Sequence, residues 1–213
     1  MNTNELVALL SVDARNSDYD KSQRQLLASL GLGALMALTA MLMFYGIRSD
    51  IGHAVYLPAF WFKQAFPSIV LLLSVGMLFR VAYPGRSPGL WGKALWIPFA
   101  TAWVVAGLSL AMSDPQARWG LVLGATWARC SLDIAFVAIP ALITTLWAVR
   151  QLAPVRLDVA GAAAGLFAGS AGAAAYALHC QEMEAPFVAV WYMVGISIPV
   201  LAGWLLGPRL LRW

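Results

Sequence analysis

The two cysteines of this chain are the residues whose type and placement best suit chemistry. Cys130 stands at the head of an apolar stretch, and Cys180 stands in a short polar segment. Two cysteines can form a disulfide where the fold brings their Cα atoms within about 7 Å. Arg129 and His179 directly precede them, and a neighbouring cation favours the reactive thiolate form of a cysteine. The sequence alone leaves three uses of this pair open.

The first use is a static disulfide that stabilises the fold, and the second is a redox-responsive pair. The third is a soft-metal site, because thiolate and imidazole are ligands that soft metals accept. Its ligands would be Cys130, Cys180 and His179, with Glu182 or Asp133 assisting. Metal binding would then be transient, and we expect no resident cofactor.

The composition argues against a water-soluble enzyme. Of the 213 residues, 61% are hydrophobic and 11% are charged, whereas an ordinary soluble domain carries about 25% charged residues. The mean hydropathy of +0.74 points the same way. The sequence shows no Ser-His-Asp arrangement, phosphate-binding glycine loop or His-Glu-x-x-His zinc motif. We therefore expect a membrane protein that is not an enzyme.

Six apolar stretches are long enough to cross a bilayer as helices, which takes about 20 residues each. The second reaches that length by extending to Tyr83, with Arg80 snorkelling to the interface. The expected fold class is an all-α membrane protein, a bundle of six transmembrane helices. The expected spans are Leu26–Ile47, Ala65–Phe79, Ala94–Met112, Cys130–Val149, Val159–Leu178 and Pro186–Leu206.

The positions of the basic residues predict the orientation of the bundle, because cytoplasmic loops carry an excess of Lys and Arg. Six spans place both termini on one side, and that side holds most of the 14 basic residues. Both termini are therefore expected in the cytoplasm, and both cysteines on the outer, oxidising side. The terminal side carries Arg15, Lys21, Arg24, Arg80, Arg86, Lys93, Arg150, Arg156, Arg209 and Arg212, and the outer side carries Arg48, Lys63, Arg118 and Arg129.

Small residues recur in the stretch predicted as the fifth span. Gly161, Gly165 and Gly169 stand four residues apart, with alanines around them. Small residues on one helix face let helix backbones approach closely in lipid. We therefore expect this span in the middle of the bundle, with a dimer interface as the alternative.

A polar N-terminal segment precedes the first span. We therefore expect two parts in the chain, a short cytoplasmic segment of residues 1–25 and a six-helix transmembrane domain of residues 26–213. Residues 13–20 are polar and of mixed charge, which predicts a flexible tether. The segment carries few basic residues, so direct nucleic-acid binding is not expected.

The start of this segment predicts a short amphipathic helix over residues 5–10. Leu6, Leu9 and Leu10 would share one face of it. A helix of two or three turns is not stable alone in water. Its apolar face must therefore lie on the membrane surface or dock into a groove of a partner protein.

Two stretches of the chain and the positions of its cysteines resemble a known family. Residues 58–63, Pro-Ala-Phe-Trp-Phe-Lys, resemble the Phe-Trp-x-Lys segment that enters the second span of that family. Residues 178–192, Leu-His-Cys-Gln-Glu-Met-Glu-Ala-Pro-Phe-Val-Ala-Val-Trp-Tyr, resemble its signature around the second cysteine. Cys130 matches the first cysteine of the family. The resemblance is to the NrsF-type membrane anti-sigma factors, and it covers essentially the whole chain.

The resemblance implies a multi-pass protein of the bacterial inner membrane whose N-terminal segment holds an extracytoplasmic-function sigma factor inactive. It implies that Cys130 and Cys180 sense an envelope oxidant or metal stress, and that this stress releases the sigma factor. Within the N-terminal segment we assign the sigma factor contacts to Leu6, Leu9 and Leu10, in addition to what the resemblance implies.

The alternative from another class is a small membrane thiol-redox enzyme or a transporter that uses the same cysteines. Transporters place ionisable residues inside the membrane, and Asp133 is the only carboxylate expected within a span here. Quinone-linked thiol oxidation would need a second cysteine pair, and the chain contains two cysteines in all. The anti-sigma interpretation is therefore preferred.

Overall fold

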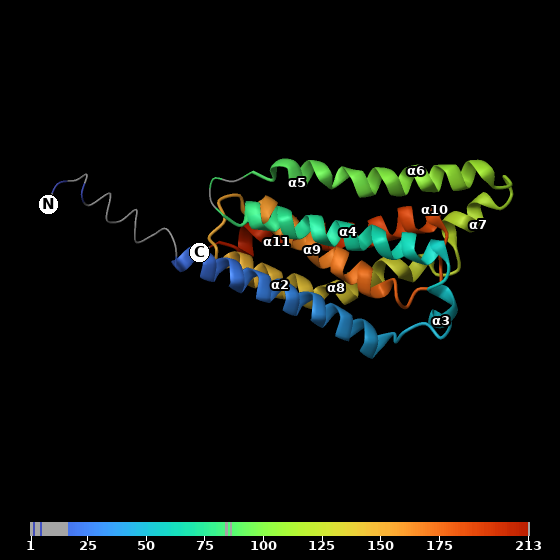
Figure 1. Cartoon of the computed structure of the whole chain (residues 1–213), viewed down its shortest axis with the longest axis horizontal. Helices are drawn as coiled ribbons and strands as arrows, with labels where there is room; N and C mark the ends of the chain where they lie inside the picture. Colours follow the sequence, from blue (N-terminus) through green and yellow to red (C-terminus); the bar gives the residue numbers. More distant parts are fainter. Residues whose placement is uncertain (1, 3–4, 6–16, 84, 86, 213) are drawn as a thin grey trace.

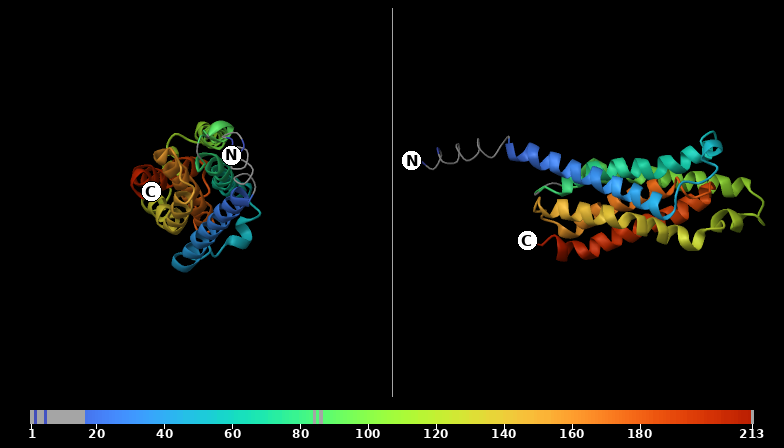
Figure 2. Two further views of the ribbon diagram at one scale, coloured as in Figure 1. Left: turned by 90° about the vertical axis from the view of Figure 1, so that its left-hand side faces the viewer. Right: turned by 90° about the horizontal axis from the view of Figure 1, so that it is seen from below.

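The computed structural model describes Asn2, Glu5 and residues 17–83, 85 and 87–212 of the chain. Every long element in these ranges is a helix, and the helices run along one elongated bundle (Figures 1 and 2). In chain order they are α2 (Ser17–Phe44), α3 (Ile51–Ala54), α4 (Pro58–Val81), α5 (Gly89–Ala94), α6 (Trp96–Met112), α7 (Arg118–Leu123), α8 (Trp127–Arg150), α9 (Leu157–Tyr176), α10 (Ala185–Phe187), the π-helix η1 (Val188–Tyr192) and α11 (Met193–Leu210).

Six helical stretches are long and apolar enough to cross a membrane, which confirms the number and order of the predicted spans. Three of them join consecutive elements: α5 with α6, α7 with α8, and α10 with η1 and α11. The stretches are Lys21–Phe44, Pro58–Val81, Gly89–Met112, Arg118–Arg150, Leu157–Tyr176 and Ala185–Leu210.

Two helices, α2 and α4, begin more than a full turn before the predicted spans, at Ser17 and Pro58. Helix α4 begins at Pro58 rather than Ala65, with proline in the first turn, where its missing N–H costs no helical hydrogen bond. It therefore reaches spanning length without an extension to Tyr83. Helix α2 begins at Ser17, so the end of the predicted tether is helical. Both helices contain polar residues near their starts, so a search for apolar runs does not find their first turns.

Helix α9 is the core of the bundle, as its small residues predicted. It packs against α2, α4, α8 and α11, and most of its residues are buried. Its alanines favour the helix and occupy little volume, so neighbouring backbones pack closely around it. The glycines Gly161, Gly165 and Gly169 all face α11. A Cβ added to Gly165 would lie 2.1 Å from the Pro199 carbonyl oxygen.

Helix α6 lies at the edge of the bundle, where Figure 1 shows it in green. It contacts α4, α10 and η1, and most of its large side chains are exposed. The sixth stretch contains the five-residue π-helix η1. A π-helix is wider than an α-helix and recurs at functional sites. In η1 the Trp191 carbonyl accepts a hydrogen bond from Ser131 Oγ at 2.8 Å.

The two ends of the bundle differ in what they contain. Helix α2 begins and helix α11 ends at one end, and α3, α7 and α10 lie at the other (Figure 1). At that second end, Gly124 ends α7 with a φ of +58°, a backbone conformation that favours glycine. The Ala125 N–H then donates to Glu182 Oε1 at 2.7 Å. This bond ties the α7–α8 turn to the loop that carries Cys180.

Candidate functional site

The structure brings Cys130 and Cys180 together at the end of the bundle that is remote from the chain ends. Cys130 lies in the first turn of α8, and Cys180 lies in the loop between α9 and α10. Both are free thiols, and their exposed fractions are 0% and 3%. The Cys130 thiol donates a hydrogen bond to the Cys180 sulfur. The arrangement suits a reaction that joins the two sulfurs.

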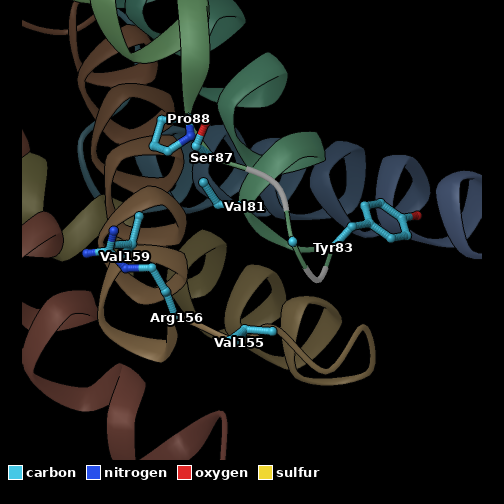
Figure 3. Close-up of a pocket in the computed structure, with 8 residues that line it drawn as sticks. Val81, Tyr83, Ser87, Pro88, Val155, Arg156 and Val159 are labelled. Carbon is cyan, nitrogen blue, oxygen red and sulfur yellow. The ribbon is translucent and has the colours of Figure 1, made fainter.

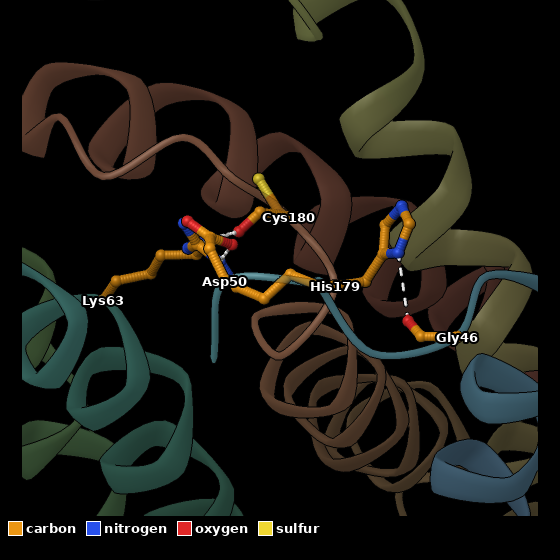
Figure 4. Close-up of polar contacts among 6 residues, drawn as sticks. Gly46, Asp50, Lys63, His179 and Cys180 are labelled. Carbon is orange, nitrogen blue, oxygen red and sulfur yellow. Dashed lines mark hydrogen bonds and ion pairs between the residues drawn. The ribbon is translucent and has the colours of Figure 1, made fainter. Parts of the chain in front are cut away.

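The backbone of Cys180 is fixed from both sides. Its N–H donates to the Tyr176 carbonyl at 3.0 Å, which extends the last turn of α9. Its carbonyl accepts hydrogen bonds from two cations, Lys63 Nζ of α4 and Arg48 Nη1 at 3.3 Å (Figure 4). A charged donor makes a stronger hydrogen bond than a neutral one. The cysteine loop is therefore tied to α4, to α9 and to the segment after α2.

The sequence did not predict the roles of Lys63 and Arg48. Both were assigned to the outer loops, whereas Lys63 lies within α4 with 0% of its surface exposed and Arg48 is 6% exposed. The signal that could have found Lys63 is a lysine inside an apolar helix, which is costly and therefore marks a functional position. Residues on both sides of it, Phe60 and Phe66, are buried as well.

The charges around the Cys180 carbonyl do not balance. Arg48 forms a two-bond ion pair with Asp50, with both nitrogen–oxygen distances at 2.7 Å. Hydrogen bonds from Arg48 hold the pKa of Asp50 below its usual range. Within the described ranges, Lys63 forms no ion pair with a carboxylate. A buried charge without a counter-ion is costly, so one positive charge at this site lacks a fixed partner.

The surroundings of Cys180 favour its thiolate form. The pKa of Cys180 is lowered to about 6, and the hydrogen bond from the Cys130 thiol is the largest cause. The charge of Lys63 and the backbone N–H of Glu182 also contribute to this lowering, against the burial that raises the pKa. A thiolate is the nucleophilic form of cysteine, so Cys180 is prepared to react.

Asp133 lies within α8 and next to the cysteine pair, as the sequence predicted for a carboxylate inside the fourth span. Its two carboxylate oxygens accept hydrogen bonds from Tyr45 at 2.9 Å and from Tyr176 at 3.1 Å. A pocket at the same end is lined by these three residues together with Arg129 and His179. The carboxylate is therefore held by two tyrosines at the edge of a polar pocket.

The structure does not assemble the three-ligand metal site of Cys130, Cys180 and His179. The His179 Nδ1 atom lies 3.0 Å from the Gly46 carbonyl oxygen, and Figure 4 shows the ring directed to that carbonyl. The ring also packs against Tyr45 and Tyr176. Over the residues that the structure describes, no group of three or more His, Cys, Asp or Glu side chains is placed to hold a metal ion.

A second pocket lies at the opposite end of the bundle (Figure 3). Residues of the α4–α5 loop, including Tyr83 and Ser87, line one side of it, and Val155, Arg156 and Val159 line the other. The predicted sigma contacts Leu6, Leu9 and Leu10 lie outside the described residues.

Comparisons with known proteins agree with the resemblance in the sequence. The chain is 36% identical over 213 residues to the probable anti-sigma-F factor NrsF of Azospira oryzae, with all of both chains covered. It is 36% identical over 219 residues to the anti-sigma-F factor NrsF of Caulobacter vibrioides, again over the full length of both. No solved structure matches the chain. The model of one family, negative regulator of sigma F, matches residues 10–213. The chain therefore belongs to the NrsF family of negative regulators of sigma F.

Proposed function

We propose that this chain is an inner-membrane anti-sigma factor. Its cytoplasmic N-terminal segment, residues 1–25, holds an extracytoplasmic-function sigma factor, and oxidation of Cys130 and Cys180 releases it. The support for sigma factor binding is family membership together with the names of two full-length relatives, both anti-sigma-F factors. These are regulatory proteins rather than enzymes.

The six apolar helices and the distribution of charge support a membrane location with both termini in the cytoplasm. The end where α2 begins holds most of the basic residues, which is typical of a cytoplasmic face. Two of the four basic residues at the other end, Arg48 and Lys63, are buried and bonded to Cys180. Arg118 and Arg129 are the exposed ones there. Half of the basic residues at that end therefore contribute no exposed positive charge.

The observation that supports sensing is the contact between Cys130 and Cys180 at the end opposite the N-terminal segment. A stimulus can shift a switch only through a different interaction energy with its two states. A bond made between these sulfurs changes the contact between α8 and the loop after α9, and α9 contacts four of the other long helices. The proposed boundary at residue 25 lies within α2, so a continuous helix from Ser17 joins the segment to the bundle.

Co-purification tests the sigma factor binding. The full-length chain is isolated from its own cells in mild detergent, and the retained proteins are identified by mass spectrometry. Wild-type protein should retain a sigma factor, Leu6→Asp should retain at least tenfold less because a charge disrupts an apolar docking face, and the control Asn2→Asp should behave as wild type. A wild-type protein that retains no sigma factor would refute the function.

A transcription reporter tests the sensing step separately. Cys130→Ser and Cys180→Ser should abolish the induction of sigma-dependent transcription by peroxide, while both variants still retain the sigma factor. Full induction in both variants would refute the role of the cysteines and leave the anti-sigma function intact.

A further inference from the structure

The positive charges around Cys180 are not balanced when its thiol is neutral. Lys63 and Arg48 both reach the Cys180 carbonyl, and one carboxylate, Asp50, is ion-paired among them. Lys63 is fully buried, so water does not solvate its ammonium group. A negative charge on the Cys180 sulfur would balance the excess positive charge. Buried charges are stable when they are paired and hydrogen-bonded.

Other polar groups around the sulfur either stabilise a negative charge on it or are not available to neutralise Lys63. The Glu182 backbone N–H lies near the Cys180 sulfur, and the side chain of Tyr192 is fully buried close to it. The Cys130 thiol donates to it from α8. The remaining titratable groups packed around the pair are Asp133 with its two tyrosine donors Tyr45 and Tyr176, and His179, which is bonded to Gly46. The nearest carboxylates are therefore already held by other donors.

We propose that Lys63 is the counter-ion of a Cys180 thiolate, and that this makes Cys180 the sulfur that is oxidised first and Cys130 the sulfur that resolves the product. Lys63 is thus a positioning residue that acts through Cys180. This inference rests on the proposed function where it takes the cysteine pair to be a sensor. The order of reaction of the two sulfurs is a property of the bundle itself.

The reaction proceeds in two balanced steps with a hydroperoxide as oxidant. The Cys180 thiolate attacks one peroxide oxygen, an S–O bond forms, the O–O bond breaks, and the departing oxygen takes a proton to become water or an alcohol. The Cys130 sulfur then attacks the Cys180 sulfenic acid. An S–S bond forms, the S–O bond breaks, and the thiol proton leaves with the hydroxyl group as water. The two thiols lose two electrons, and the peroxide gains them.

Purified full-length protein in detergent tests the order of reaction. Hydrogen peroxide is added to Cys130→Ser and to Cys180→Ser, and sulfenic acid is trapped with dimedone and measured by mass spectrometry. Serine at position 130 keeps a hydroxyl donor for the Cys180 sulfur. Cys180 in the first variant should be trapped at least tenfold faster than Cys130 in the second. Equal rates, or a faster Cys130, would overturn the proposed order.

The pH profile tests the role of Lys63. Lys63→Gln keeps a donor for the Cys180 carbonyl but removes the charge, so a purely structural role would leave the profile unchanged. In Lys63→Gln, the pH at which the rate of Cys180 oxidation reaches half of its maximum should rise by about one unit or more. The rate near pH 6 should fall about tenfold. Lys63→Arg should stay close to wild type. An unchanged midpoint in Lys63→Gln would refute the counter-ion.

Wild-type protein supplies the measurement that does not depend on folding of a variant. The rate at which hydrogen peroxide oxidises its Cys180 should reach half of its maximum below pH 8, and a midpoint at pH 8 or above would also refute the proposal. These experiments use no sigma factor. A failure of sigma factor retention therefore leaves their outcome untouched, and a failure here leaves the anti-sigma function untouched.

Discussion

Gly161 of α9 and Gly203 of α11 face each other with no side chain between them. A Cβ added to either glycine would lie 2.1 Å from the carbonyl oxygen of the other. Such contacts cannot be relieved by a side-chain rotation, because the opposing atoms belong to the backbone. The two helices can therefore lie this close because both positions are glycine.

Gly203→Ala should destabilise the bundle, since one methyl group would force α9 and α11 apart. Overpacking of this kind costs about 1–3 kcal/mol. Thermal unfolding in detergent, followed by circular dichroism, measures the effect. The matched control is Gly107→Ala in α6, where an added Cβ meets nothing within 4 Å. Equal unfolding midpoints for the two variants would contradict the close packing of α9 on α11.

The sequence predicted the fold well where one physical signal dominates. Apolar length gave six helices, and the spacing of Gly161, Gly165 and Gly169 gave the central helix. It predicted helix starts poorly, because Pro58 and Lys63 are unlike the residues of an apolar run. Lys63 is accommodated in the helix because it is buried against the cysteine loop, which is distant in sequence.

The stability of the protein should depend on pH through Cys180. Its pKa is about 6 in the folded protein and 9.0 for an ordinary cysteine, and the hydrogen bond from Cys130 is the largest cause of this lowering. The folded state therefore holds this proton less tightly than the unfolded chain. The stabilisation is complete above about pH 9, declines as the pH falls, and is lost below about pH 6.

The measurement is the unfolding temperature of wild type and Cys180→Ser in detergent between pH 6 and pH 9. The difference in favour of wild type should grow with rising pH, because only wild type carries the thiolate. Parallel curves for the two proteins would show that Cys180 is not ionised in the fold.

The orientation in the membrane can be tested with introduced cysteines, because Cys130 and Cys180 are too buried to report it. Ser49 and Ser87 are exposed and lie at opposite ends of the bundle. Ser49→Cys should react with a membrane-impermeant maleimide in cells with a permeabilised outer membrane. Ser87→Cys should react only after the inner membrane is broken. The reverse pattern would invert the proposed topology, and wild type treated in parallel supplies the background labelling of Cys130 and Cys180.

Glu182 should limit access to the cysteine pair, because its side chain accepts the Ala125 N–H at 2.7 Å. Loss of a hydrogen bond to a charged group costs about 1.5–3 kcal/mol, so Glu182→Ala should raise the rate of Cys180 alkylation by iodoacetamide about tenfold or more. Glu184→Ala, a change at an exposed position of the same loop, is the control. The alkylation rates of the two variants are compared at one pH. Equal rates would contradict the role of this contact.

The sequence identified the two cysteines but not the residues that prepare them. Neighbours in the sequence, Arg129 and His179, were expected to act on the sulfurs. In the structure His179 is bonded to Gly46, and the nearby cation is Lys63, which comes from another helix. Such a convergence of segments depends on tertiary packing, and local spacing carries no signal for it.

Two neighbouring aromatic residues of the π-helix η1 contact different parts of the bundle. Tyr192 is fully buried near Cys180, while the ring nitrogen of the neighbouring Trp191 donates to the Val122 carbonyl at 2.9 Å. A wide turn holds more residues than a regular one. Deleting one residue between Val188 and Tyr192 would therefore rotate Phe187 by about 100° out of its buried position. The length of this turn is what aligns the loop before it with the long helix after it.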